Sequence, residues 1–272
     1  MEEDQRRLLQ AISKQKTSMI SVVINTYNAE LHLKKVLESI KDFDEIVICD
    51  MESTDHTLDI AKEYGCKIVC FPKQNYTIVE PARNFAIQQA SHEWVLVVDA
   101  DEIVPPTLKQ YLYDIISDKG QNIHGVYIPR RNYFMGTFMH SLYPDYILRF
   151  FRKDSVDWPP IIHVQPNVTG RVIYAPKTTE TSFEHLANDT ISTRLKKTDI
   201  YTDNECIKKA DKHYGVIAFL FRPTHRFIKS YFIKGGFRDG LPGFIYACLE
   251  AMYQVVMMGK IRQKHSPCNT RS

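Results

Sequence analysis

The sequence predicts an α/β protein with a mixed, mainly parallel sheet flanked by helices, followed by a helical C-terminal region. Three observations support this prediction. In the first hundred residues, short β-branched runs alternate with polar turns and helical patterns, which is typical of a parallel sheet. After Pro105 the apolar runs follow one another as in an antiparallel or mixed sheet. From Asp189 onward, apolar residues recur at helical spacing.

Four buried strands are expected in the first hundred residues, because four apolar runs each end in polar residues. They are Met19–Asn25, Glu45–Cys49, Lys67–Phe71 and Trp94–Val98. Apolar spacings of three and four predict the helices between them, which are Ala29–Ile40, Leu58–Tyr64 and Glu80–Ala90. We expect Ser53 or Thr54 to cap the second helix and Gly65 to close it.

The second half is expected to begin with a helix from Pro105 to Ile116. Later apolar runs predict the strands His124–Pro129, Tyr133–Phe138, Tyr146–Phe151 and Val172–Ala175. The next helix has Asn188 or Asp189 as its expected cap. Its apolar face consists of Ile191, Leu195, Thr198 and Tyr201.

The chain length of 272 residues favours one large domain with an appendage. We expect a tail over residues 1–16, a domain over 17–187 and a helical region over 188–272. The composition is 44% hydrophobic and 25% charged, which excludes disordered and fibrous proteins. The six cysteines lack paired CxxC spacing, so we expect reduced thiols rather than disulfides or a zinc site. The first sixteen residues lack the apolar run of a signal peptide, and a cytoplasmic location is therefore expected.

Basic charge is concentrated near the C-terminal end. From Arg222 to Ser272, nine Lys or Arg stand against two acids, a net charge of +7 in a chain whose total is +3. Basic and aromatic residues alternate there, which is typical of a helix lying on a membrane. We expect peripheral docking on an anionic surface at the inner face of the cell membrane, with a packed hairpin or a dimer contact as the alternative. A helix that spans the bilayer is less favoured, and nucleic acid is not expected as a partner because no recognition motif is present.

Two carboxylates follow the apolar run WVLVV. Asp99 and Asp101 stand two positions apart, where a parallel sheet presents residues at its ligand-binding edge. Together they would attract a hard divalent cation such as Mg²⁺ or Mn²⁺, which can in turn hold a diphosphate. The alternative is that these acids only cap the next helix.

Other strands deliver polar residues to the same edge. Asp50 ends the second strand, Asn25-Thr26-Tyr27-Asn28 ends the first, and Arg83 lies in the helix before WVLVV. A helix cap is the alternative for Asp50, and a solvated helix face is the alternative for Arg83.

With the motifs SVVINTYN, IVICDMESTDHT, EPARNFAIQQA and WVLVVDADE in this order, the chain resembles glycosyltransferase family 2, the inverting sugar-nucleotide transferases with the GT-A fold. The later stretch YPDYILRFFRK, followed by a Trp and a His, is similar to bacterial transferases that build lipopolysaccharide cores. The resemblance implies a GT-A-like, Rossmann-type sheet.

The resemblance also implies roles for the residues at the strand ends. Thr26, Asn28 and Asp50 would bind the donor nucleoside, with Asp50 on the base. Arg83 would lie near the base or the diphosphate, Asp99 would contact the ribose or the metal, and Asp101 would ligate the metal. A cation at the diphosphate stabilises the charge that develops on the leaving group.

The general base is where this sequence departs from the family pattern. The relatives show His-Glu after the tryptophan, whereas here Val164 follows His163. Asp145 is the first candidate to replace the glutamate, His163 the second and Glu184 the third. Asp145 could instead be a turn residue and His163 a structural histidine. His185 is a candidate ligand of the metal or a phosphate, with a structural role as its alternative.

The implied function is metal-assisted, inverting transfer of a hexose from a nucleotide sugar, expected to be UDP-linked. The acceptor would be a glycan or lipid-linked saccharide of the cell surface or of lipopolysaccharide. One alternative is a sugar nucleotidyltransferase, although NTYNAELHLKK is not a glycine-rich phosphate loop. The other is a catalytically inactive membrane partner protein that binds nucleotide sugars.

Overall fold

The computed structural model describes residues 19–73, 80–117, 122–159, 165–209 and 211–265. The chain divides into two compact units. Unit 1 consists of Met1–Arg130 and Tyr146–Glu184, and unit 2 consists of Arg131–Asp145 and His185–Ser272. Unit 2 therefore includes an internal segment in addition to the C-terminal residues.

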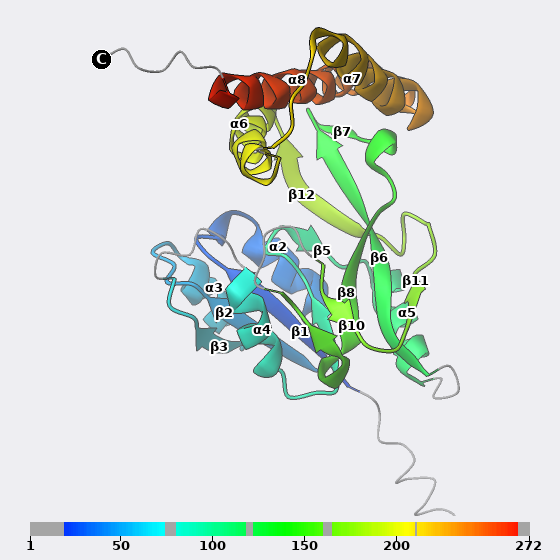
Figure 1. The fold of residues 1–272 in the computed structure, drawn as a ribbon. Helices are drawn as coiled ribbons and strands as arrows, with labels where there is room; N and C mark the ends of the chain where they lie inside the picture. Colours follow the sequence, from blue (N-terminus) through cyan, green and yellow to red (C-terminus); the bar gives the residue numbers. More distant parts are fainter. Residues whose placement is uncertain (1–18, 74–79, 118–121, 160–164, 210, 266–272) are drawn as a thin grey trace, which may run out of the picture. The chain divides into compact units, whose positions relative to one another are not determined.

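Parallel strands form the first part of the sheet in unit 1 (Figure 1), as the sequence predicts. In spatial order they are β3 (Lys67–Cys70), β2 (Glu45–Asp50), β1 (Ile20–Thr26) and β4 (Trp94–Val97). The antiparallel partner of β4 is β8 (Asp145–Arg152), which makes the sheet mixed. Because β1 and β2 run in parallel with Thr26 opposite Asp50, their polar ends meet at one edge.

Helices cover both faces of these strands. They are α2 (Glu30–Ile40), α3 (Thr57–Glu63), α4 (Glu80–Gln88) and α5 (Pro106–Ser117). Side chains alternate across a strand, so Val22 packs with the apolar faces of α2 and α5, while Val23 packs with the alanines of α4. Burial of both faces explains the nearly continuous apolar runs in the sequence.

The expected cap of the second helix is wrong. Helix α3 begins at Thr57, and Asp55 accepts a hydrogen bond from the Thr57 amide at 3.0 Å. Ser53 instead bonds to Asp50, which draws it toward the end of β2. The prediction for Gly65 is confirmed, since its φ of 66° is the left-handed conformation that glycine adopts after a helix.

The second half contains more strands than predicted. The two strands expected between His124 and Phe138 are one long strand, β6 (Ile123–Phe134), followed by the short β7 (Thr137–Phe138). Met135 and Gly136 form the turn between them with positive φ, so the chain reverses later than expected. Four strands were not predicted: β5 (Glu102–Ile103), β9 (Val156–Asp157), β10 (Asn167–Val168) and β12 (Phe183–Asp189). The predicted strand near Val172 is β11 (Arg171–Tyr174).

Unit 2 contains the C-terminal helices. They are α6 (Ile191–Lys208), α7 (Val216–Ile228), a π-helical turn η4 (Lys229–Ile233), a 3₁₀ turn η5 (Gly236–Asp239) and α8 (Gly240–His265). Helix α8 packs against both α6 and α7, and Figure 1 shows α7 and α8 side by side. By length and composition, the segment Gly236–Lys264 could cross a membrane. The cap of α6 is Thr190, whose side chain accepts from the Thr193 amide, rather than Asn188 or Asp189, because both of those lie in β12.

Candidate functional site

The first part of the candidate site lies at the ends of β1 and β2. Thr26 and Asp50 are both buried, and the Thr26 hydroxyl donates to Asp50 Oδ1 at 2.9 Å. The Ser53 amide donates to Asp50 Oδ2 at 2.8 Å, and its hydroxyl donates to Oδ1 at 2.6 Å. These three donors fix the orientation of the Asp50 carboxylate. The structure thus brings together Thr26 and Asp50, two of the residues predicted to bind the nucleoside.

Asn28 joins the same cluster. Its backbone amide donates to Ser53 Oγ at 2.9 Å, and its side-chain oxygen accepts from the Thr54 amide at 2.8 Å. Its φ of 49° is left-handed, which asparagine tolerates better than most residues do. The loop after β1 is therefore tied to the loop after β2, at the edge where the sequence predicts a ligand.

Two arginines hold Asp99, which follows β4. Arg83 donates to Asp99 Oδ1 and Arg149 donates to Oδ2, each at 2.8 Å. Both arginine side chains are about nine-tenths buried. Burial favours the neutral acid, but Arg149 and Arg83 outweigh it and hold the pKa of Asp99 below its usual range. Asp99 is therefore ionised, and it aligns two guanidinium groups.

Trp158 lies against both arginines. The guanidinium carbon of Arg83 is 4.8 Å from a ring centroid of Trp158, and that of Arg149 is 5.2 Å from it. The Trp158 amide donates to Asn84 Oδ1 at 3.0 Å, so helix α4 holds the tryptophan in place. Arginines stacked on an aromatic ring and paired with a carboxylate form a rigid cationic surface suited to phosphate.

Glu102 supports the same group from within the protein. Its side chain is fully buried, accepts from the Asp99 amide at 3.0 Å and pairs with Arg130 at 3.1 Å. Burial, followed by the neighbouring Asp99, raises the pKa of Glu102. Three arginines and two acids therefore form one network around the turn that carries Asp101.

Asp101 occupies the turn after β4 and is partly exposed. Among the described residues, no three His, Cys, Asp or Glu side chains are grouped as a metal site. Both oxygens of Asp99 accept arginine donors, so we take the partly exposed Asp101 as the candidate carboxylate ligand. One carboxylate suffices for a magnesium-like ion that keeps its waters and takes its other ligands from a diphosphate. The residues present fit such an ion.

A second group of candidate residues lies in unit 2. Asn132 donates from Nδ2 to Asp145 Oδ2 at 2.9 Å, and its Oδ1 lies 3.0 Å from His185 Nδ1. One amide thus connects the first candidate base with the candidate histidine ligand. Glu184 lies on β12 in unit 1, and His163 lies outside the described residues.

Sequence reasoning missed Arg149, Asn132, Glu102 and the role of Trp158. Arg149 does have a local signal, since it is the one charged residue in Ile147–Phe151, a stretch of β8 whose other residues are apolar. A charge in a buried strand requires a partner. Nothing local indicates that the partner is Asp99, fifty positions earlier.

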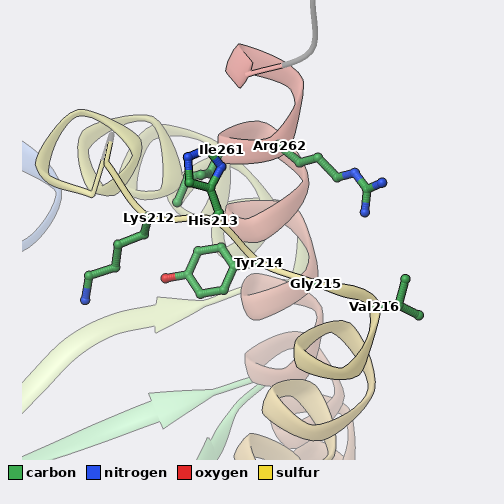
Figure 2. Close-up of a pocket in the computed structure, with 7 residues that line it drawn as sticks. All are labelled: Lys212, His213, Tyr214, Gly215, Val216, Ile261 and Arg262. Atoms are coloured by element: carbon green, nitrogen blue, oxygen red, sulfur yellow. The ribbon is translucent and has the colours of Figure 1, made fainter.

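A pocket of about 410 Å³ lies near the end of α8 in unit 2. Figure 2 shows that Lys212 and Arg262 extend away from each other, with Tyr214 between them. None of the predicted site residues lines this pocket, and its polar groups do not converge on one point. It is therefore not the candidate active site.

Comparisons with known proteins agree with this arrangement. The family model described as glycosyl transferase family 2 matches residues 21–172, which include the residues around Asp50 and Asp99. The lipopolysaccharide core biosynthesis glycosyltransferase LpsC of Rhizobium meliloti is 28% identical over 260 residues, 91% of this chain and 93% of that protein. An uncharacterized glycosyltransferase of Rickettsia bellii is 26% identical over 274 residues, 94% of this chain and 91% of that protein.

A solved structure has a related fold. The mannosyltransferase PcManGT of Pyrobaculum calidifontis, determined with GDP-Man and Mn²⁺, aligns with a TM-score of 0.50. The alignment covers 95% of this chain and 78% of that one at 13% identity, so the likeness concerns the fold. The GT-A-like sheet with a C-terminal helical region is confirmed.

Proposed function

The chain belongs to glycosyl transferase family 2 and is a glycosyltransferase, and we propose that it transfers a hexose from a nucleotide sugar to a saccharide acceptor with inversion. The observation that carries this proposal is the sheet edge in unit 1 at which the parallel neighbours β1, β2 and β4 end. Thr26 is hydrogen-bonded to Asp50 at the ends of β1 and β2, and Arg83 is paired with Asp99 after β4. This family assignment favours sugar transfer over the nucleotidyltransferase alternative.

The Asp50 cluster is proposed to hold the nucleoside. The Asp50 carboxylate is oriented by Thr26 and Ser53, so it can accept a hydrogen bond from the N–H of a uracil-like base. We take UDP as the donor nucleotide, and GDP is the competitor in the titration below because the N–H groups of guanine suit the same acceptor. Arg83 and Arg149, aligned by Asp99, are proposed to face the charge of the diphosphate.

Asp101 is proposed to hold a divalent metal, with Asp99 aligning the arginines and reaching the ribose. Bound Mg²⁺ or Mn²⁺ would stabilise the negative charge that develops on the leaving diphosphate. Arg83 and Arg149 add fixed positive charge that needs no reorganisation during the reaction. His185 is kept as a candidate further ligand of the metal or a phosphate.

Asp145 is proposed as the general base that accepts the proton of the acceptor hydroxyl. The amide of Asn132 donates to Asp145 Oδ2 and orients the carboxylate, which is the type of group that accepts a proton in this role. A carboxylate in this role replaces the glutamate that the relatives carry after their histidine. His163 and Glu184 remain the second and third candidates.

The acceptor is proposed to be a lipid-linked glycan, as in lipopolysaccharide or another cell-surface polysaccharide. LpsC acts in lipopolysaccharide core biosynthesis, and it matches this chain over nearly its whole length. We further propose that unit 2 docks on the inner face of the cell membrane. Large apolar side chains of α7 support this, since Ile217, Leu220 and Phe221 are about 70% exposed.

Binding of nucleotides to the wild type and to Asp101→Asn tests the donor site. Calorimetric titration with UDP, GDP and their hexose conjugates, with and without Mn²⁺, is expected to show metal-dependent binding of the uridine nucleotides. Loss of one carboxylate ligand should weaken the metal-dependent part about 10–100-fold. Asp114→Asn, which changes an exposed aspartate of α5, is the matched control and should bind like the wild type.

Three results separate the proposals. Metal-dependent binding with turnover of the nucleotide sugar supports the enzyme. Tight binding without hydrolysis or transfer to any glycan would favour the inactive partner protein. If no nucleotide binds, or if Asp101→Asn binds as the wild type does, the acids after β4 are structural and the proposed site is wrong.

A further inference from the structure

A pocket of about 250 Å³ in unit 2 is lined by basic side chains. It lies among α6, the end of α7, η4 and α8, away in sequence from the acids after β4. Four of its eight lining residues are Lys or Arg and one is an acid. The lining consists of Leu142, Arg194, Arg226, Lys229, Ser230, Lys234, Tyr246 and Glu250.

Glu250 aligns the two arginines of the pocket. Its Oε1 accepts from Arg194 Nη2 at 2.8 Å, and its Oε2 accepts from Arg226 Nε at 2.8 Å. The Glu250 side chain is only 13% exposed, so its carboxylate contacts the two guanidinium groups from the buried side of the pocket. Each carboxylate oxygen already accepts from an arginine, and the single charge of Glu250 is shared between two cations.

The two lysines of the pocket have no acid to pair with. Lys229 and Lys234 are exposed, and the side chain of neither forms a hydrogen bond or ion pair with any described residue. With Arg194, Arg226 and Glu250 they give the pocket lining a net charge of +3. Four cations around one small volume repel one another, and a bound anion would relieve this repulsion.

Two further donors in the pocket also lack acceptors. The Tyr246 hydroxyl accepts from Arg194 Nη2 at 3.1 Å, and among the described residues nothing accepts its own proton. Burial, followed by Glu250, raises the pKa of Tyr246, so the hydroxyl keeps that proton. Arg194 Nε is buried and has no hydrogen-bond partner within the described part of the chain. The pocket therefore offers N–H and O–H donors together with positive charge.

The surroundings of the lysines are apolar. Phe232 and Ile233 lie between them in sequence and are 57% and 73% exposed. They belong to η4, a π-helical turn, a conformation that often occurs at functional sites. A phosphate on a soluble molecule gains nothing from these side chains, whereas a lipid phosphate lies at the level where aromatic residues enter the membrane.

We propose that this pocket binds the phosphate group of a membrane lipid, with Arg194, Arg226, Lys229 and Lys234 as its cationic ligands. The inference rests on the proposed membrane docking of unit 2 and names the headgroup that the unit recognises. Tyr246 donates its hydroxyl proton to a phosphate oxygen. Phe232 and Ile233 enter the lipid beside it.

Vesicle binding of Lys229→Ala/Lys234→Ala tests the pocket. Sedimentation is measured with phosphatidylcholine vesicles that contain phosphatidic acid, and with vesicles given the same net charge by oleic acid. The wild type is expected to prefer phosphatidic acid. The double variant should bind it about 10-fold more weakly or worse, because it loses two basic contacts.

Lys196→Ala/Lys208→Ala is the matched control. Both lysines are exposed on α6, neither lines the pocket, and the change in net charge is the same. This variant should keep most of the binding. If the two double variants lose vesicle binding equally, or if the wild type binds the two kinds of vesicle equally, binding depends only on net charge and the inference is wrong.

A measurement without vesicles tests whether the pocket binds a lipid phosphate or the phosphate of a soluble molecule. Calorimetry with inorganic pyrophosphate is expected to show weaker binding than phosphatidic acid vesicles. If the protein binds pyrophosphate tightly but does not bind vesicles, the phosphate is not that of a lipid and the inference is wrong. If the wild type binds no anionic vesicle, both the membrane docking of unit 2 and the lipid phosphate site are wrong. If Lys229→Ala/Lys234→Ala binds vesicles as the wild type does, only the lipid phosphate site is wrong. Nucleotide binding at Asp50 and Asp101 is unaffected by either result.

Discussion

Buried and partly buried carboxylates in unit 1 are held by different donors. Asp50 accepts hydroxyl and amide hydrogens, and Asp99 accepts two guanidinium groups. Glu45 is a third case, away from the proposed donor site. Its oxygens accept from the Ser91 amide at 2.7 Å and the Ser91 hydroxyl at 2.6 Å, and also from Ser21. For Asp99 and Glu45 the donors lower the pKa of the carboxyl group and so stabilise its charged form, which couples folding to pH.

The Glu45 carboxylate is expected to contribute to stability only above acidic pH. Burial acts to raise its pKa, but the hydrogen bonds from Ser21 and Ser91 outweigh burial and lower it. A carboxyl whose pKa is lower in the folded state stabilises the protein above its unfolded pKa and loses that effect as the pH falls through the folded value. Glu45→Gln should reduce the free energy of unfolding at neutral pH by about 1–3 kcal/mol.

Urea unfolding at a series of pH values checks this prediction. Below about pH 4.5, the variant should lose less stability than the wild type does. Glu63→Gln, at an exposed position of α3, should stay within about 0.5 kcal/mol of the wild type. Parallel pH curves for wild type and Glu45→Gln would show that the hydrogen bonds of Glu45 do not favour its charged form.

At the scale of elements, the start of α8 depends on a close approach by η5. A Cβ on Gly243 would meet the carbonyl oxygen of Gly236 and lie 2.7 Å from Asp239 Cβ. Asp239 in turn accepts from the amides of His140 and Ser141 at 2.8 and 3.1 Å. The glycine thus permits a contact that positions η5 and the loop after β7 within unit 2.

Two glycines of α8 are expected to respond in opposite ways to alanine. Gly243→Ala should destabilise the protein by about 1–3 kcal/mol, because backbone must move to admit the methyl group. Gly259→Ala meets no atom within 4 Å, and it should stabilise the helix by about 0.5–1 kcal/mol because glycine has low helix propensity. Denaturant unfolding followed by far-UV circular dichroism measures both. Equal effects would mean that η5 does not pack against α8 in solution.

At the scale of the whole molecule, apolar surface is distributed unevenly. The described residues of unit 1 form two continuous cores on the faces of the sheet, whereas α7 has no buried residue. Its large side chains recur at helical spacing and face solvent, which is costly for a protein that stays in water. The membrane docking proposed above would cover them.

Ile217→Glu/Phe221→Glu is expected to weaken binding to anionic vesicles at least about 10-fold, since two apolar side chains no longer enter the lipid. The two side chains are 71% and 70% exposed, so the unfolding midpoint should not change. Ile200→Glu/Ile207→Glu changes two exposed residues of α6, which are 58% and 70% exposed, and is the control. Unchanged vesicle binding by the α7 variant would show that this face does not contact lipid.

Local patterns in the sequence were enough for several parts of the fold. The four parallel strands and the helices between them were predicted, because burial on both faces produces apolar runs and one-sided burial produces helical spacing. Prediction failed where a turn determines where a strand or helix begins or ends. The β6 strand was divided in two, and the caps of α3 and α6 were misplaced, because several adjacent polar residues can each cap a helix.

The sequence by itself determined the family, the order of the strands along the chain and the meeting of Thr26 with Asp50 at the sheet edge. Only the tertiary structure decided that Arg149 and Trp158 surround Asp99, that Asn132 joins Asp145 to His185, and that four basic residues converge on one pocket. The physical reason is distance along the chain. The periodicity of the sequence predicts whether a residue is buried. Which charged groups pair depends on how strands and helices pack, and the local sequence does not specify this packing.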